Sequence, residues 1–193
     1  PGIGNPYGAQ DRENFTALMK ELREAMDATG EKLTLTFAAA GWDKYFENIE
    51  TLEVMKYADY INLMTYDFVG GMQPFTAHHT NLGRISLMDL EGTEYYEYIN
   101  DSIIGKGQTD WQPRSIEGIV DYCEGLGIDR SQMVVGAAFY GKAWKVSKTE
   151  NNGLFQPVAG PQNGWPSYGA IRDSMENKNG YTVYRDEKAK APY

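Results

Sequence analysis

The chain has 193 residues, with 18 lysines and arginines against 27 aspartates and glutamates, which gives a formal charge of −9. This acidic balance argues against a protein that binds nucleic acid or an anionic membrane, because such proteins place clustered basic charge against phosphates. Hydrophobic residues make up 41% of the chain, which is typical of a globular protein and too apolar for a disordered one. A single cysteine, Cys123, excludes an intrachain disulfide and a multi-cysteine metal site.

The N-terminal part of the chain predicts a helix and two short strands. Apolar residues recur at helical spacing over 15–26, with Asp11 as the expected N-cap and Gly30 as the stop. Two further runs are short, rich in β-prone residues and apolar, which favours buried strands. The strands are expected over 33–40 and 60–66, and a short helix is expected between them over 49–55.

The middle of the chain begins with a long irregular stretch over 67–114, in which one helix is expected over 94–104. Loops of that length inside compact domains are usually functional or are insertions. Ser115 is then expected to cap a helix whose apolar stripe ends at Gly127, and a third buried strand is predicted over 133–139.

The order of these elements predicts an α/β fold with a parallel sheet. Helices alternate with strands that are apolar throughout rather than alternating, which is typical of parallel strands covered by helices. A (β/α)8 barrel and an open doubly wound sheet both fit this pattern. After Trp144 the composition shifts to Asn, Gly, Pro and Tyr, with one more strand expected over 180–185. We therefore expect one domain over 1–144 and part of a small α+β domain over 145–193.

Candidate functional residues lie where the predicted strands end, because the chemistry of parallel α/β folds is placed there. Met64, Tyr66 and Asp67 stand at the end of the second strand. Met64 and Tyr66 are two residues apart on this strand and should therefore point the same way. The end of the third strand offers Tyr140 and the residues up to Trp144, whose aromatic faces suit sugar rings. Ordinary core and rim packing is the alternative interpretation of each cluster.

The run over 59–68, DYINLMTYDF, resembles the Met-x-Tyr-Asp strand of the family 18 glycoside hydrolases, the chitinases. The resemblance implies a partial (β/α)8 barrel of about three strands with part of an α+β insertion domain. Four other stretches resemble parts of that family in the same order. Residues 33–40 resemble the preceding barrel strand, and His78-His79 with Leu82 resembles the loop after Met-x-Tyr-Asp. Residues 135–144 resemble the next strand end, and the tail that begins at 153–157 and ends at 191–193 resembles the insertion domain.

This resemblance also implies an activity and a set of roles. Members hydrolyse β-1,4-linked N-acetylglucosamine with retention of configuration, and the substrate's own acetamide attacks the anomeric carbon instead of an enzyme carboxylate. By position, Tyr66 would hydrogen-bond the acetamide carbonyl, and Asp67 would orient the sugar. The residues expected to contact substrate are Ala38, Met64, Met72, Tyr140, Lys142 and Trp144.

Three departures from the family pattern stand out. The general acid belongs to an Asp-x-x-Asp-x-Asp-x-Glu motif, which does not occur in residues 1–193. The opening residues 1–6 resemble the loop after that motif, so the acid is expected upstream and the isolated chain is expected to be an inactive fragment. Met72 stands where many relatives have Trp, which should weaken sugar stacking. Lys142 stands where Arg is usual, which keeps the charge but loses the guanidinium fork.

Two functional alternatives remain beside the chitinase interpretation: a lectin-like relative that binds chitin oligosaccharides without cleaving them, and an unrelated parallel α/β domain. The resemblance implies no metal or organic cofactor. The sequence agrees for a metal, because His78 and His79 are adjacent and there is no other histidine. The expected partners are chitin or N-acetylglucosamine oligosaccharides. Self-association is also expected, since unpaired sheet edges of a partial barrel invite it. The resemblance further implies an extracellular location.

Overall fold

The computed structural model describes residues 5–70, 73–160 and 163–193. These residues form two compact units. Unit 1 comprises the chain up to Met64 together with Ile119–Gly136, and unit 2 comprises Thr65–Gly118 and Ala137–Tyr193. Within the described ranges, no helix is both long enough and apolar enough to cross a membrane. The predicted division into 1–144 and 145–193 stays a prediction.

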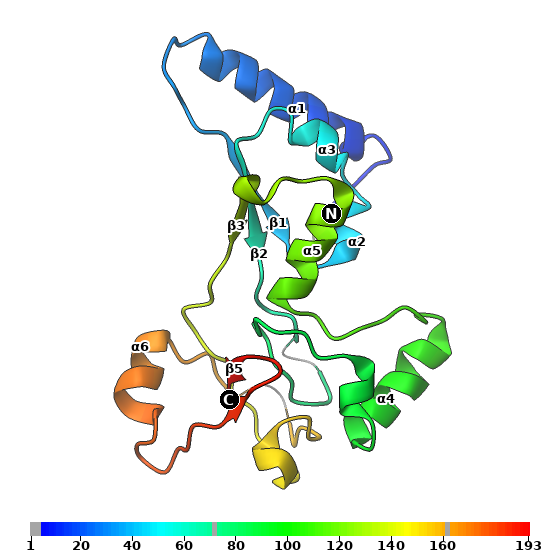
Figure 1. Ribbon diagram of the computed structural model, residues 1–193, viewed down its shortest axis with the longest axis vertical. Helices are drawn as coiled ribbons and strands as arrows, with labels where there is room; N and C mark the ends of the chain where they lie inside the picture. The colour runs from blue at the N-terminus through cyan, green and yellow to red at the C-terminus, as the bar shows by residue number, and fades with distance from the viewer. Residues whose placement is uncertain (1–4, 71–72, 161–162) are drawn as a thin grey trace. The chain divides into compact units, whose positions relative to one another are not determined.

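Unit 1 contains a three-stranded sheet in the order β1-β2-β3, with all strands parallel (Figure 1). The strands are β1 (Thr36–Ala40), β2 (Tyr60–Met64) and β3 (Met133–Val135). Consecutive parallel strands need a crossover, and helices provide it here. The predicted parallel sheet with intervening helices is therefore confirmed.

The helices of unit 1 mostly follow the predicted start and stop signals. Ser115 Oγ accepts a hydrogen bond from the Gly118 amide at 3.0 Å, and Gly127 has a φ of +99°, so the expected cap and stop of α5 are confirmed. The expected N-cap at Asp11 is wrong, because Gln10 takes that position and the Asp11 carboxylate instead accepts from the Gly8 amide at 3.0 Å. The elements are α1 (Asp11–Asp27), α2 (Asp43–Phe46), α3 (Thr51–Val54), α5 (Ile116–Leu126, of which unit 1 holds the part from Ile119) and the 3₁₀ helix η3 (Arg130–Gln132).

The core of unit 1 lies between one face of the sheet and these helices. Ile61 and Leu63 of β2 are buried, and Val54 and Cys123 from the helices pack into the same cluster. Burial raises the pKa of the Cys123 thiol to about 11, so this thiol is inert at neutral pH.

The third strand is shorter and more exposed than the sequence predicts. A buried strand was expected over 133–139, whereas β3 ends at Val135, and Val134 and Val135 are 43% and 44% exposed. The physical reason is that β3 is an edge of the sheet, paired with β2 alone among the described residues. Self-association through such an edge stays a prediction.

Unit 2 is built mainly from short elements and loops (Figure 1). The strand expected over 180–185 is wrong: β4 begins only at Arg185, because Asn177, Asn179 and Gly180 have positive φ and fold the preceding residues into turns. The elements are η1 (Leu87–Leu90), α4 (Glu94–Ser102), η2 (Ile104–Lys106), η4 (Glu150–Gly153), α6 (Tyr168–Ala170), the π-helix η5 (Ile171–Met175), and the antiparallel pair β4 (Arg185–Asp186) and β5 (Ala191–Pro192).

An aromatic cluster forms the core of unit 2. The ring of Phe155 stacks on that of Tyr95 with centroids 5.8 Å apart, and Ile99 of α4 is buried beside them. His78 joins this core from the 65–85 segment, and its Nε2 lies 2.9 Å from Asp186 Oδ2 of β4. This contact ties the C-terminal hairpin to the loop that follows Asp67.

Candidate functional site

The candidate site is organised around the backbone turn at Asp67. Strand β2 ends at Met64, so Tyr66 lies outside it and strand alternation does not extend from Met64 to Tyr66. The prediction that these two side chains point the same way assumed a strand through Tyr66, so it does not follow from the observed strand. Asp67 has a φ of +59°, in the left-handed region that non-glycine residues rarely adopt. Strained backbone of this kind gathers at functional sites.

Two side chains hold the Asp67 carboxylate through one of its oxygens. The Tyr140 hydroxyl donates to Asp67 Oδ1 at 2.8 Å, and Lys142 Nζ lies 2.8 Å from the same oxygen. The Asp67 side chain is 43% exposed, so the carboxylate combines two fixed partners with access to solvent. Charge-assisted hydrogen bonds of this type orient an acidic group firmly.

The side chain of Lys142 is buried although it carries a charge. Its side chain is 1% exposed, and its ammonium group also donates to the Val69 carbonyl oxygen at 2.6 Å. The ring of Trp165 covers the same group, with Nζ 4.6 Å from the ring centroid. A buried cation needs such partners because desolvation is costly. Lys142 therefore links the Asp67 carboxylate to the backbone of the segment that follows it.

Tyr140 is the centre of an aromatic group. Its ring contacts Tyr66 edge-on with centroids 6.3 Å apart, and it also contacts His79 at 5.3 Å and Trp165 at 5.7 Å. Burial, followed by the nearby Lys142 charge, lowers the pKa of His79. His79 is therefore neutral at physiological pH.

The protonation states of the site follow from these contacts. Desolvation alone would raise the pKa of Asp67, but the hydrogen bonds from Lys142 and Tyr140 and the Lys142 charge outweigh it, so the pKa lies below its ordinary value. Desolvation, and then the hydrogen bond to Asp67, raise the pKa of the Tyr140 hydroxyl. At neutral pH, Asp67 is thus an anion and Tyr140 a hydrogen-bond donor.

The structure brings four of the predicted residues together, which are Tyr66, Asp67, Tyr140 and Lys142. Ala38 lies in the middle of β1, where it pairs with Asn62, and Met64 is the last residue of β2. The buried Trp144 Nε1 has no hydrogen-bond partner among the described atoms. Met72 lies outside the described residues.

Sequence reasoning missed His79 and Trp165 as neighbours of the Asp67 cluster. From the sequence, His79 was considered as a metal ligand and as part of the loop after Met-x-Tyr-Asp, but not as a neighbour of Asp67. No cluster of three or more His, Cys, Asp or Glu that could hold a metal occurs in the described part of the chain. The signal for Trp165 is weak, because it lies in a Gly- and Pro-rich stretch far along the chain from Asp67.

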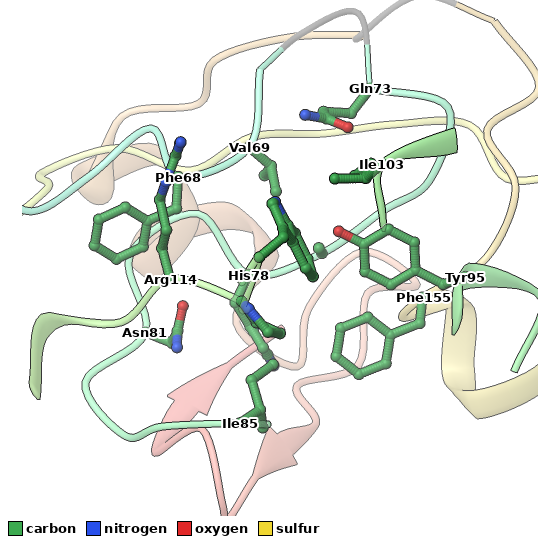
Figure 2. Close-up of a pocket in the computed structure, with 13 residues that line it drawn as sticks. Phe68, Val69, Gln73, His78, Asn81, Ile85, Tyr95, Ile103, Arg114 and Phe155 are labelled. Carbon is green, nitrogen blue, oxygen red and sulfur yellow. The ribbon is translucent and has the colours of Figure 1, made fainter. Parts of the chain in front are cut away.

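A cavity of about 90 Å³ has Phe68 and Val69, from the segment that follows Asp67, in its wall. Figure 2 shows Asn81 and Arg114 on one side of it, and Tyr95 and Phe155 on the other. The buried Asn81 Oδ1 has no protein hydrogen-bond partner among the described atoms. The cavity is far smaller than the roughly 300–1,000 Å³ of ligand pockets, so it does not hold a sugar ring.

Comparison with known proteins identifies the family. The profile of the glycosyl hydrolases family 18 matches residues 3–193. The chain is 29% identical to chitinase A1 of Niallia circulans over 98% of its own length and 26% of that protein. Among solved structures, it is similar to a family 18 N-acetylglucosaminidase from Paenibacillus barengoltzii, with a TM-score of 0.78, 33% identity, and coverage of 97% of this chain and 50% of that one. It is also similar to a chitinase from Bacillus thuringiensis, with a TM-score of 0.79, 26% identity, and coverage of 98% and 31%.

The likeness covers nearly all of this chain but only a part of each relative. The chain spans about a quarter of the length of the curated relative, and 50% and 31% of the two solved chains. The three parallel strands of unit 1 with their helices correspond to part of the (β/α)8 barrel of these hydrolases, as the resemblance at 59–68 predicts. The chain belongs to the glycosyl hydrolases family 18.

Proposed function

We propose that this chain carries the substrate-positioning part of a chitinase that hydrolyses β-1,4-linked N-acetylglucosamine polymers with retention of configuration. The observation that supports the proposal is the Asp67 carboxylate, which is ionised and held by Tyr140 and Lys142 beside Tyr66. Family membership supplies the chemistry for which such a carboxylate is suited. The names of the relatives, which include chitinases, agree with this substrate class.

The proposed reaction uses the acetamide of the substrate as its nucleophile. The acetamide oxygen attacks the anomeric carbon, the glycosidic bond breaks, and an acid protonates the leaving oxygen. Positive charge then spreads over the oxazolinium ring. An anion fixed beforehand stabilises this charge without having to reorganise, which is the role of Asp67. Tyr66 donates a hydrogen bond to the acetamide oxygen, and both residues thereby hold the acetamide in its attacking geometry.

The remaining substrate contacts follow the family pattern. By that pattern, we propose sugar contacts at the cleavage point for Ala38 and Met64 of unit 1 and for Tyr140 and Trp144 of unit 2. Met72, which lies outside the described residues, stands where many relatives have Trp, and we propose that its thioether stacks on a sugar more weakly than an indole would. Lys142 keeps a positive charge beside the carboxylate without the two-pronged geometry of arginine.

The general acid of the proposed reaction comes from residues outside 1–193, since this range contains no Asp-x-x-Asp-x-Asp-x-Glu motif. The test is a mass-spectrometric time course of N-acetylglucosamine pentamer with two proteins: the 193-residue chain, and a longer chain that includes the preceding barrel strands. We expect cleavage by the longer chain alone. Cleavage by the short chain would mean that a carboxylate within it replaces the acid, and the proposed mechanism would be wrong.

Variants of the longer chain also distinguish the loss of a substrate-positioning contact from a general loss of folding. Tyr66→Phe removes one hydroxyl from the proposed acetamide contact and should lower the cleavage rate by about 10²–10³-fold, the usual effect of losing one transition-state donor. Tyr60→Phe is the matched control, because Tyr60 lies exposed at the start of β2. If neither chain cleaves the pentamer but both bind it, the lectin-like alternative replaces the hydrolase.

We also propose an extracellular location, since an insoluble polymer reaches the enzyme only outside the cell.

A further inference from the structure

Trp165 and Lys142 face each other across a short antiparallel ribbon in unit 2. Isolated bridges pair Tyr140 with Ser167 and Ala143 with Gly164, and the Gly141 amide donates to the Pro166 carbonyl at 2.8 Å. This register sets Lys142 directly opposite Trp165. Directly opposed side chains of a paired segment lie on the same face, which explains why the two residues meet.

The other face of the same ribbon carries a different aromatic pair. Phe139 and Tyr168 are also opposed in this register, and their rings contact edge-on with centroids 5.9 Å apart. Phe139 is 72% exposed, and it lies one residue before Tyr140, on the side away from the carboxylate. Phe139 is therefore a matched control for Trp165, because it lies in the same ribbon but faces away from the Asp67 carboxylate.

The Lys142 ammonium group has two oxygen partners, Asp67 Oδ1 and the Val69 carbonyl. An ammonium is a compact, strongly hydrated charge on a flexible four-carbon stem, so its own geometry does not keep it on two oxygens. Water would compete for its protons wherever it has access. The Trp165 ring lies over the ammonium group and is itself 58% exposed, so the indole stands between Lys142 and solvent.

We propose that Trp165 is a positioning residue, which keeps the Lys142 ammonium group on Asp67 Oδ1 and the Val69 carbonyl and thereby fixes the Asp67 carboxylate. The ring acts in two ways. Its face attracts the cation, and its bulk excludes water that would draw the ammonium group away. The proposal rests on the proposed function only in assigning the carboxylate a role in hydrolysis. The mechanical link from Trp165 through Lys142 to Asp67 holds independently of the reaction.

The test is the pKa of Asp67, measured by NMR titration of its side-chain carboxyl carbon in the 193-residue chain without substrate. Lys142→Met removes the cation and should raise this pKa, because an opposite charge and hydrogen bond at 2.8 Å favour the anion. Trp165→Leu should also raise the pKa of Asp67. Trp165→Phe should raise it by less, because a smaller ring remains. Phe139→Leu is the control and should leave the Asp67 pKa unchanged.

The double variant Trp165→Leu with Lys142→Met decides whether Trp165 acts through Lys142. We expect no further rise beyond that of Lys142→Met alone. An unchanged pKa in both Trp165 variants, or additive rises in the double variant, overturns the proposal. Trp165 is largely exposed, so its substitution should leave the circular dichroism spectrum unchanged, and the milder Trp165→Phe variant gives the answer if it does not. No cleavage is measured here, so failure of the chitinase proposal would leave this result unaffected.

Discussion

Substitution of Asp186 should loosen the C-terminal hairpin from the aromatic core of unit 2. Asp186 Oδ1 accepts hydrogen bonds from the Lys188 and Ala189 amides at 3.0 and 2.9 Å, and its Oδ2 lies 2.9 Å from His78 Nε2. Desolvation opposes ionisation of Asp186, but the Ala189 amide and His78 outweigh it, so the pKa of Asp186 is lowered. An ionised carboxylate only accepts hydrogen bonds, so His78 Nε2 carries the proton and donates it.

The loss of unfolding free energy depends on which hydrogen-bond partners of Asp186 can reach water once the carboxylate is removed. In Asp186→Ala, the exposed Lys188 amide can turn to solvent. The amide of the fully buried Ala189 and the buried His78 ring cannot. Leaving a buried donor unsatisfied costs about 1–3 kcal/mol, so two of them cost about 2–6 kcal/mol of unfolding free energy. Asp186→Asn retains an oxygen acceptor of the same shape and should cost about 1 kcal/mol.

The assay is urea unfolding followed by circular dichroism, together with hydrogen exchange at the Gly83 amide, which donates to the Ala189 carbonyl at 2.8 Å. Arg185→Ala is the control, because Arg185 is exposed and its contact with Glu187 spans 4.0 Å at the surface. It should change stability by less than about 0.5 kcal/mol. The reasoning is refuted if Asp186→Ala is as mild as the control, or if Asp186→Asn is as damaging as Asp186→Ala.

Further expectations concern pH, packing and close backbone approach. The contribution of Asp186 should be fully present above its ordinary pKa of 3.8 and should disappear as the pH falls through the lowered folded-state value, so urea midpoints of wild type and Asp186→Asn should converge in acid. Leu63→Ala in the core of unit 1 should cost about 2–5 kcal/mol in calorimetry, whereas Leu52→Ala, at a half-exposed position, should cost much less. Gly83→Ala would drive a Cβ into the Lys188 carbonyl oxygen and should lower the thermal midpoint. Gly125→Ala has open space inside α5 and should raise stability by about 0.5–1 kcal/mol.

Local signals were sufficient to predict both ends of α5 and the presence of the three parallel strands. Ser115 and Gly127 bound α5 because a cap and a left-handed stop depend on a few neighbouring residues. The end of β2 was predicted two residues too late, because the left-handed turn at Asp67 depends on partners more than 70 residues away. The pairing of Lys142 with Trp165 was not predicted, since a ribbon register requires knowing which segments meet. The sequence and the family resemblance therefore named Tyr66, Asp67, Tyr140 and Lys142 as candidates but did not predict the contacts among them.

The left-handed backbone at Asp67 restricts which substitutions can be interpreted there. Asparagine and aspartate tolerate this conformation, whereas most other side chains pay about 1–2 kcal/mol to adopt it. Asp67→Asn therefore changes the charge while keeping the turn, the shape and an oxygen for Tyr140. Asp67→Ala or Asp67→Leu changes the charge and the chain path at once. An activity loss in those variants would be ascribed to missing chemistry when part of it came from a displaced Tyr66, so in mutational scans of this site asparagine is the informative replacement.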